Sequence, residues 1–154
     1  MKKIFYSLAL ASLIWSCKPT ENTVSSSVQN EISVDIDLNN VTDDKVMVTV
    51  STPQITVDKI TYHIPKIIPG TYSEDDYGKF IENLKAYDKK GNVLVVAKMD
   101  DNSWSILDAK KLAKITYWVN DTYDTEGETE DKIFSPAGTN IDAGKNFMIN
   151  THGF

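Results

Sequence analysis

Apolar and polar residues alternate along this chain from residue 31 onward. Residues 32–38 place Ile, Val, Ile and Leu at every second position, and residues 46–50 do the same with Val. A period of two is typical of a β-strand with one buried face. Both segments are therefore predicted to be strands whose alternate apolar side chains enter a core.

Further segments rich in β-branched and aromatic residues predict strands over 55–64, 80–87, 93–99, 103–106 and 112–119. Turn residues separate these segments, and Gly91 can take the left-handed conformation that a short hairpin requires. Short strands at this spacing, without a strong helix pattern, are typical of an antiparallel sandwich. We therefore predict an all-β fold, an antiparallel β-sandwich, over residues 31–154.

Residues 64–72, here called the Pro-Gly segment, connect two of the predicted strands. Pro69 fixes φ as the second residue of a turn requires, and Gly70 supplies the positive φ of the third, which is the chemistry of a type II turn. Pro65 and Pro69 lack a backbone donor, so the segment cannot be a central strand throughout. We expect a rigid, shaped connection, followed over residues 73–79 by a loop or a short helical turn.

The N-terminus has the pattern of a targeting segment. Two lysines precede the apolar residues 4–15, a stretch too short to span a bilayer as a stable helix. A small residue then precedes Cys17, as in a bacterial lipoprotein signal, where the cysteine is lipidated; an ordinary secretory signal with an incidental cysteine is the alternative. Cys17 is the one cysteine of the chain, so it has no partner for an intrachain disulfide.

These features predict a signal peptide over residues 1–16 and a lipid on Cys17. Residues 17–30 are rich in Ser, Thr and Asn and cannot bury enough apolar surface to fold alone, so we expect a flexible tether. The expected location is the bacterial cell envelope, with the lipid in a membrane and the folded part facing the periplasm or the exterior.

Charge bears on the choice of partner. The chain has 22 acidic and 16 basic residues, a net charge of −6, and every basic residue is a lysine. Binding to nucleic acid requires a concentrated basic surface. We therefore expect no nucleic-acid partner.

Candidate catalytic chemistry is sparse. The sequence contains no His-Glu-x-x-His, no Gly-x-Ser-x-Gly and no phosphate loop. His63 and His152 would need a further ligand to hold zinc, so we expect satisfied or exposed histidines and no metal site. The acidic residues 121–131 do not have the spacing of a calcium loop, and we expect a solvated loop there. No catalytic residue and no cofactor are predicted within this chain.

An ordered series of short motifs resembles the N-terminal domain of the glycyl-aminopeptidase family of zinc metallopeptidases, family sixty-one. The series begins with Pro65-x-x-x-Pro69-Gly70-Thr71-Tyr72 and Tyr77-Gly78-Lys79-Phe80. It continues through Ala86-Tyr87-Asp88, Gly91-Asn92-Val93-Leu94, Asn102-Ser103-Trp104, Ile115-Thr116-Tyr117-Trp118-Val119, Ser135-Pro136-Ala137-Gly138-Thr139-Asn140 and Asn150-Thr151-His152-Gly153-Phe154. The family often has Trp where this chain has Ile67, and Arg where it has Lys79.

This resemblance implies a β-rich domain that precedes a thermolysin-like zinc domain and often a PDZ domain. The zinc ligands and general base would then lie downstream, so this chain alone is expected to be inactive. The resemblance also implies that the β domain packs against the catalytic domain and shapes its cleft. The scaffold residues carried over from the family motifs are Pro65, Pro69, Gly70, Thr71, Tyr72, Gly78 and Trp104.

Two further expectations concern the extent of the chain. The apolar residues near Phe154 suggest a strand in progress, and so a fragment of a longer enzyme. The alternative is a complete small lipoprotein, a β-sandwich that binds a protein or glycan. Its candidate binding aromatics are Tyr72, Tyr77, Trp104 and Trp118.

Overall fold

The computed structural model describes residues 31–123, 133 and 137–154. The predicted signal peptide, the tether, the lipidation site at Cys17 and most of the acidic loop lie outside these residues. Within the described part, no helix is long and apolar enough to cross a membrane.

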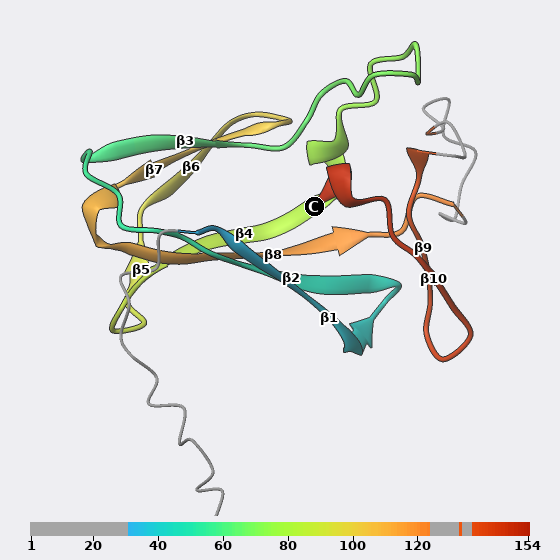
Figure 1. Ribbon diagram of the computed structural model, residues 1–154, viewed down its shortest axis with the longest axis horizontal. Coiled ribbons are helices and arrows are strands. Elements are labelled where there is room, and N and C mark those ends of the chain that lie inside the picture. The colour runs from blue at the N-terminus through green and yellow to red at the C-terminus, as the bar shows by residue number, and fades with distance from the viewer. Residues whose placement is uncertain (1–30, 124–132, 134–136) are drawn as a thin grey trace, which may run out of the picture.

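The described residues form three antiparallel sheets (Figure 1). The five-stranded sheet has the order β1 (Ser33–Thr42), β2 (Lys45–Ser51), β8 (Leu112–Asn120), β4 (Ile81–Asp88) and β5 (Val93–Leu94). The three-stranded sheet has the order β3 (Lys59–His63), β7 (Ser103–Leu107) and β6 (Val96–Asp100). The small third sheet pairs β10 (Asn146–Met148) with β9 (Asn140–Asp142). Short 3₁₀ turns lie at η1 (Tyr77–Phe80), η2 (Ala109–Lys111) and η4 (Thr151–Gly153).

The two larger sheets face each other, and the core lies between them (Figure 1). Val46, Val48 and Val50 of β2 point into this core and are at most 4% exposed, as their alternation predicts. Their neighbours include Ile106 of β7 and Ile115 of β8, both buried in the same cluster. The predicted all-β antiparallel fold is confirmed.

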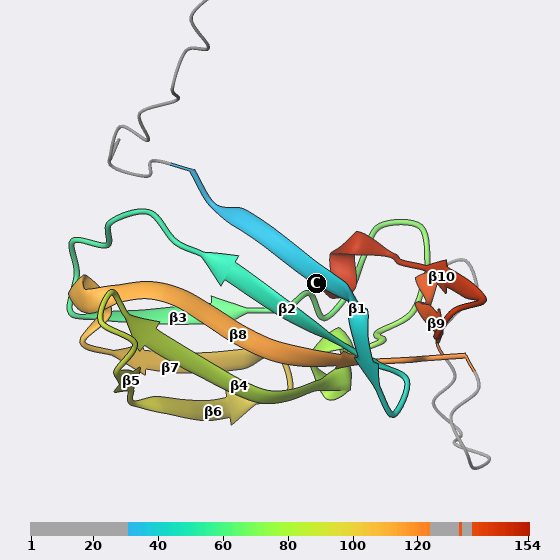
Figure 2. The ribbon, with the colours of Figure 1, turned by 90° about the horizontal axis from the view of Figure 1, so that it is seen from below.

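The prediction of a buried face for residues 32–38 is wrong except at Ile36, which is half-buried and packs against the core. These residues do form part of a strand, β1, but Val34 is 48% exposed and Leu38 is 40% exposed. The physical reason is the unequal size of the sheets: in Figure 2, β1 lies beyond the area that β3, β7 and β6 cover. Two strand bounds also differ, because residues 55–58 precede β3 as a loop and residues 93–99 divide into β5 and β6.

The expected strand in progress at the C-terminus is also wrong. Strand β10 ends at Met148, and the chain then closes in the 3₁₀ turn η4. Gly153 is buried, and a Cβ added to it would lie 3.7 Å from the ring of Tyr77. Phe154 packs against the core instead of being exposed. The apolar residues of this end therefore serve packing within the domain.

Two tyrosines, one on each sheet, join the facing sheets. The hydroxyl of Tyr62 on β3 and that of Tyr117 on β8 lie 2.9 Å apart in a hydrogen bond, and the ring centroids are 6.0 Å apart. Tyr117 is fully buried and Tyr62 is half-buried. Burial raises the pKa of both hydroxyls above the ordinary tyrosine value, because the interior disfavours a phenolate.

Glycine is required where η1 meets the turn between β6 and β7. A Cβ on Gly78 would lie 2.0 Å from the carbonyl oxygen of Asp101 and 2.8 Å from the Cα of Asn102. Both contacts are with backbone, so no side-chain rotation can relieve them. Gly78 therefore lets η1 approach this turn closely.

The tyrosine pair predicts a loss of stability in alkali. An unfolded tyrosine has a pKa of about 10, and the folded values are higher, so the contribution is complete below about pH 10 and is lost as the pH rises through the folded pKa values. Urea denaturation between about pH 8 and pH 11 should show a smaller alkaline loss in the Tyr62→Phe/Tyr117→Phe double variant. At the lower pH, Tyr62→Phe alone should lower the free energy of unfolding by about 1–3 kcal/mol, because it leaves the buried hydroxyl of Tyr117 unpaired. An equal alkaline loss of unfolding free energy in the unmodified chain and in the double variant would show that the tyrosine pair does not cause the loss.

A second prediction concerns Gly78. The substitution Gly78→Ala should lower the free energy of unfolding by about 3 kcal/mol, because backbone must move to admit the methyl group. Gly91→Ala is the matched control: its Cβ meets nothing within 4 Å, and its left-handed φ should cost only about 1–2 kcal/mol. Chemical denaturation of both variants gives the comparison, and a smaller cost at Gly78 than at Gly91 would show that the close approach is not required.

Candidate functional site

The Pro-Gly segment leaves the end of β3 and extends beyond the two sheets (Figure 1). Gly70 has a φ of +101°, which agrees with the predicted turn. The Thr71 hydroxyl donates to the carbonyl oxygen of Ile68 at 3.1 Å and closes the tip on itself. Tyr72 also has a positive φ, +57°, which is unusual for a residue with a large side chain.

Backbone hydrogen bonds close the base of this loop. The amides of Asp75 and Asp76 both donate to the carbonyl oxygen of Lys66, at 3.1 and 3.0 Å. The amide of Tyr77 donates to the carbonyl oxygen of Pro65 at 3.2 Å. Three backbone hydrogen bonds, donated by three consecutive residues, therefore join the two ends of the loop.

The side chain of Asn102 attaches this base to the three-stranded sheet. Its amide nitrogen donates to a carboxylate oxygen of Asp76 at 2.7 Å, and its amide oxygen accepts from the backbone N–H of Gly78 at 3.0 Å. The backbone carbonyl of Asn102 also accepts from the amide of Ile64 at 2.9 Å. One residue of the turn between β6 and β7 thus binds both ends of the loop.

A buried carboxylate stabilises the same base from within. Asp75 is 6% exposed and accepts from the hydroxyl of Ser73 at 2.8 Å and from that of Tyr77 at 3.1 Å. Burial, followed by the hydrogen bond to Asp75, raises the pKa of Tyr77 well above its usual range, so the phenol stays a donor. The ring of Tyr77 meets that of His152 edge to face at 5.0 Å, which links the loop base to η4.

The result of this anchoring is an aromatic ring held in solvent. Tyr72 is as exposed as a residue of an extended chain, and Ile67 on the same loop is 53% exposed. A positive φ on a residue with a Cβ carries strain, which persists where the surroundings fix the conformation. A rigid loop that presents an exposed ring offers a contact surface at low cost in conformational entropy.

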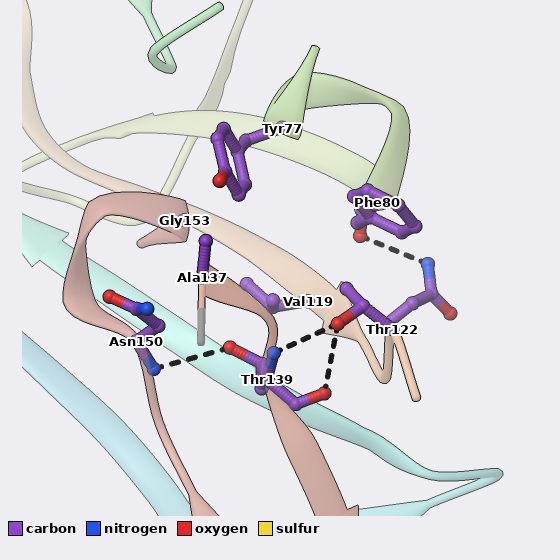
Figure 3. A pocket seen from close by; sticks show the side chains of 9 residues that line it. Tyr77, Phe80, Val119, Thr122, Ala137, Thr139, Asn150 and Gly153 are labelled. Carbon is purple, nitrogen blue, oxygen red and sulfur yellow. Dashed lines mark hydrogen bonds between the residues drawn. The ribbon is translucent and has the colours of Figure 1, made fainter. Parts of the chain in front are cut away.

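A small hollow lies beside this base, at the junction of η1, β8 and η4 (Figure 3). It is lined by Tyr77, Phe80, Val119, Asn120, Thr122, Ala137, Thr139, Asn150 and Gly153. Its free volume of about 10 Å³ is close to the least that one water molecule requires. The hydroxyl of Thr122 accepts from the amide of Thr139 at 2.8 Å, and that of Thr139 accepts from the amide of Asn150 at 3.3 Å. The hollow is a packing joint that is too small for a peptide.

The structure separates the candidate residues of the sequence into two groups. Pro65, Pro69, Gly70, Thr71 and Tyr72 lie together on the loop, and Gly78 lies at its base in η1. Trp104 is 4% exposed within β7 and serves the core.

The four aromatics proposed as one binding face do not form it. Tyr77 is 3% exposed and Trp104 is 4% exposed, because both side chains belong to the hydrophobic core. Trp118 of β8 is half-buried, and Tyr72 alone among the four is fully exposed. The idea of an aromatic binding face therefore needs correction.

The two histidines have separate polar partners. His63 Nδ1 lies 3.0 Å from the hydroxyl of Ser103, and His152 Nε2 lies 3.2 Å from the carbonyl oxygen of Ala137. Among residues 31–123, 133 and 137–154, no three His, Cys, Asp or Glu side chains are grouped so that they could hold a metal ion. The side chains of this described part therefore do not provide a set of ligands for the zinc that the resemblance implies.

Two polar contributions are not apparent from the sequence. Asp76 and Asn102 bind each other across the loop base, and their spacing of 26 residues gives no signal of this contact in the sequence. Asp121 was expected in a solvated loop, but it is 5% exposed and accepts from the backbone amides of Tyr123 and Ile141. The second result is a correction: Asp121 stabilises the junction between β8 and β9, because two amides there need an acceptor.

Comparison with known proteins supplies the remaining observations. The family model of the Peptidase M61 N-terminal domain matches residues 33–154. A search of curated proteins found no match. Among solved structures, the chain is similar to the crystal structure of the aminopeptidase N family protein from Idiomarina loihiensis, with a TM-score of 0.54 and 26% sequence identity. That match covers 61% of this chain and 16% of the other chain, so this chain corresponds to a small part of the longer protein.

The family match extends over most of the chain and includes the loop, its base and the C-terminal turn. The structural neighbour is independently described as a member of an aminopeptidase family. On these findings, the chain belongs to the Peptidase M61 N-terminal domain family.

Proposed function

We propose that this chain is the non-catalytic N-terminal domain of a lipid-anchored zinc aminopeptidase. In this proposal the domain packs against a downstream catalytic domain, which holds the zinc, and shapes the cleft of that domain. The family match supports a role within a peptidase. The observation that carries the finer proposal is the loop that holds Tyr72 fully in solvent on a base fixed by Lys66, Asp76 and Asn102.

The chemistry of this loop suits a wall of a cleft. The ring of Tyr72 is large and amphipathic, and such rings contribute strongly to contact surfaces when they become buried. Ile67 adds apolar area on the same loop. Because the base is fixed before any contact forms, contact costs little backbone freedom, and the main entropic cost is that of ordering the exposed ring of Tyr72. The domain would thus position a side chain and take no direct part in proton transfer or zinc binding.

The N-terminal part of the proposal rests on sequence. A lipid on Cys17 would anchor the protein to a membrane of the cell envelope, and residues 17–30 would hold the β domain away from the bilayer. Family members are expected to favour small residues such as Gly or Ala at the substrate N-terminus. A glycine anilide is therefore a suitable probe substrate.

The proposal predicts activity in the longer polypeptide and none in the isolated chain. The 154-residue chain, supplied with zinc, should not hydrolyse glycine p-nitroanilide. The polypeptide encoded by the continued reading frame should contain His-Glu-x-x-His and hydrolyse it. Turnover by the isolated chain that a chelator abolishes would contradict the proposal, as would a reading frame without a peptidase domain.

The same polypeptide tests the role of the loop. Tyr72→Asn removes the ring but retains a side chain that tolerates the left-handed backbone, and it should lower kcat/KM about tenfold, the size of a moderate buried contact. Val93→Ala is the matched control, since Val93 is a 65% exposed apolar residue of β5 away from the loop. Unchanged kcat/KM in Tyr72→Asn would exclude the ring from the cleft.

A further inference from the structure

An apolar strip lies at β1 and is formed by Ile32, just before the strand, and by Val34, Ile36 and Leu38 within it. Val34 lies opposite Val50 and Ile36 lies opposite Val48, so these side chains share the core face of the sheet. Val48 and Val50 are at most 4% exposed, whereas Ile32 and Val34 are 66% and 48% exposed. Ile36 is half-buried against the core, so the core face is covered at β2 and partly covered at Ile36, and it is uncovered at Ile32 and Val34.

The strip consists of neighbouring apolar residues and is not a single exposed side chain. Ile32, Val34 and Ile36 occur at every second position and form one apolar row. Leu38 lies at the end of this row, where the register of β1 shifts after Asp37. Within the described residues, β1 pairs with β2 on one side and is the edge of its sheet on the other. Figure 2 shows β1 beyond the area of the three-stranded sheet. A contiguous exposed apolar row on a folded domain indicates a contact surface.

We propose that the apolar strip of β1 is the surface on which the catalytic domain of the same polypeptide docks. This inference rests on the proposed function and adds the place of contact. The C-terminus lies on the side of the five-stranded sheet that faces the three-stranded sheet, which is also the side of the strip (Figure 1). A polypeptide that continues from Phe154 would therefore emerge toward the face that the strip presents.

The charges of this region select against other occupants. Residues 31–44 contain five acidic residues and no basic residue. If two copies paired antiparallel through β1 about Ile36, Asp35 of each would lie opposite Asp37 of the other, and like charges in such positions are destabilising. The same acidic residues repel an anionic membrane surface. A domain joined by the chain itself needs no such charge attraction, because its effective concentration is high.

The accessibility of an introduced thiol tests this docking surface. In a Cys17→Ser background the chain has no other cysteine, so Val34→Cys reports on the strip and Asp35→Cys reports on the opposite face of the same strand. Maleimide labelling is compared between the 154-residue chain and the polypeptide of the continued reading frame. We expect at least about tenfold slower labelling of Val34→Cys in the longer polypeptide, and equal rates for Asp35→Cys.

The outcomes distinguish this inference from the proposed function. Equal labelling of Val34→Cys in both polypeptides, with glycine p-nitroanilide hydrolysis intact, would overturn the docking surface and leave the proposed function in place. Protection of Val34→Cys in the isolated chain, with sedimentation as a dimer, would show that a second copy covers the strip and would also overturn it. Protection that appears only with added phosphatidylglycerol vesicles would assign the strip to a membrane instead. A reading frame without a peptidase domain would overturn both proposals.

Discussion

The Pro-Gly segment depends on one hydrogen-bonded joint, in which Asn102 binds Asp76 and Gly78 while the carbonyl oxygen of Lys66 accepts from two backbone amides. These contacts fix both ends of a loop whose own prolines already limit its freedom. The joint is possible because Gly78 lacks a Cβ, which would collide with the backbone of Asp101. An exposed ring at the tip is useful for contact only if this joint holds it in place.

The second constraint is the mismatch between the two large sheets. The three-stranded sheet lies toward the β4 side of the five-stranded one, away from β1 (Figure 2), and 3₁₀ turns with the C-terminal residues close one end. The apolar strip of β1 remains uncovered by this arrangement except at Ile36. The loop and the strip are thus two separate surfaces of one domain, and a partner that contacted both would bury the ring and complete the sandwich.

Local patterns in the sequence predicted most of the fold. Alternation identified β1 and β2, and the Pro69–Gly70 and Gly91 signals identified turns whose glycines have positive φ. Alternation could not reveal that β1 is uncovered, because the pattern of a strand carries no information about the width of the opposing sheet. The pairing of Asp76 with Asn102 was equally hidden, since it depends on the tertiary approach of distant turns. Family motifs located the loop, but the residues that make it rigid lie partly outside those motifs.

The central claim is that the Pro-Gly segment is as rigid as the sheets that support it. Backbone ¹⁵N relaxation of the chain measures this directly, residue by residue. We expect order parameters of about 0.85 for residues 66–72, similar to those of β2 and β8. Order parameters below about 0.6 in the same residues would describe a flexible loop, and would contradict the claim that this domain presents Tyr72 in a fixed position.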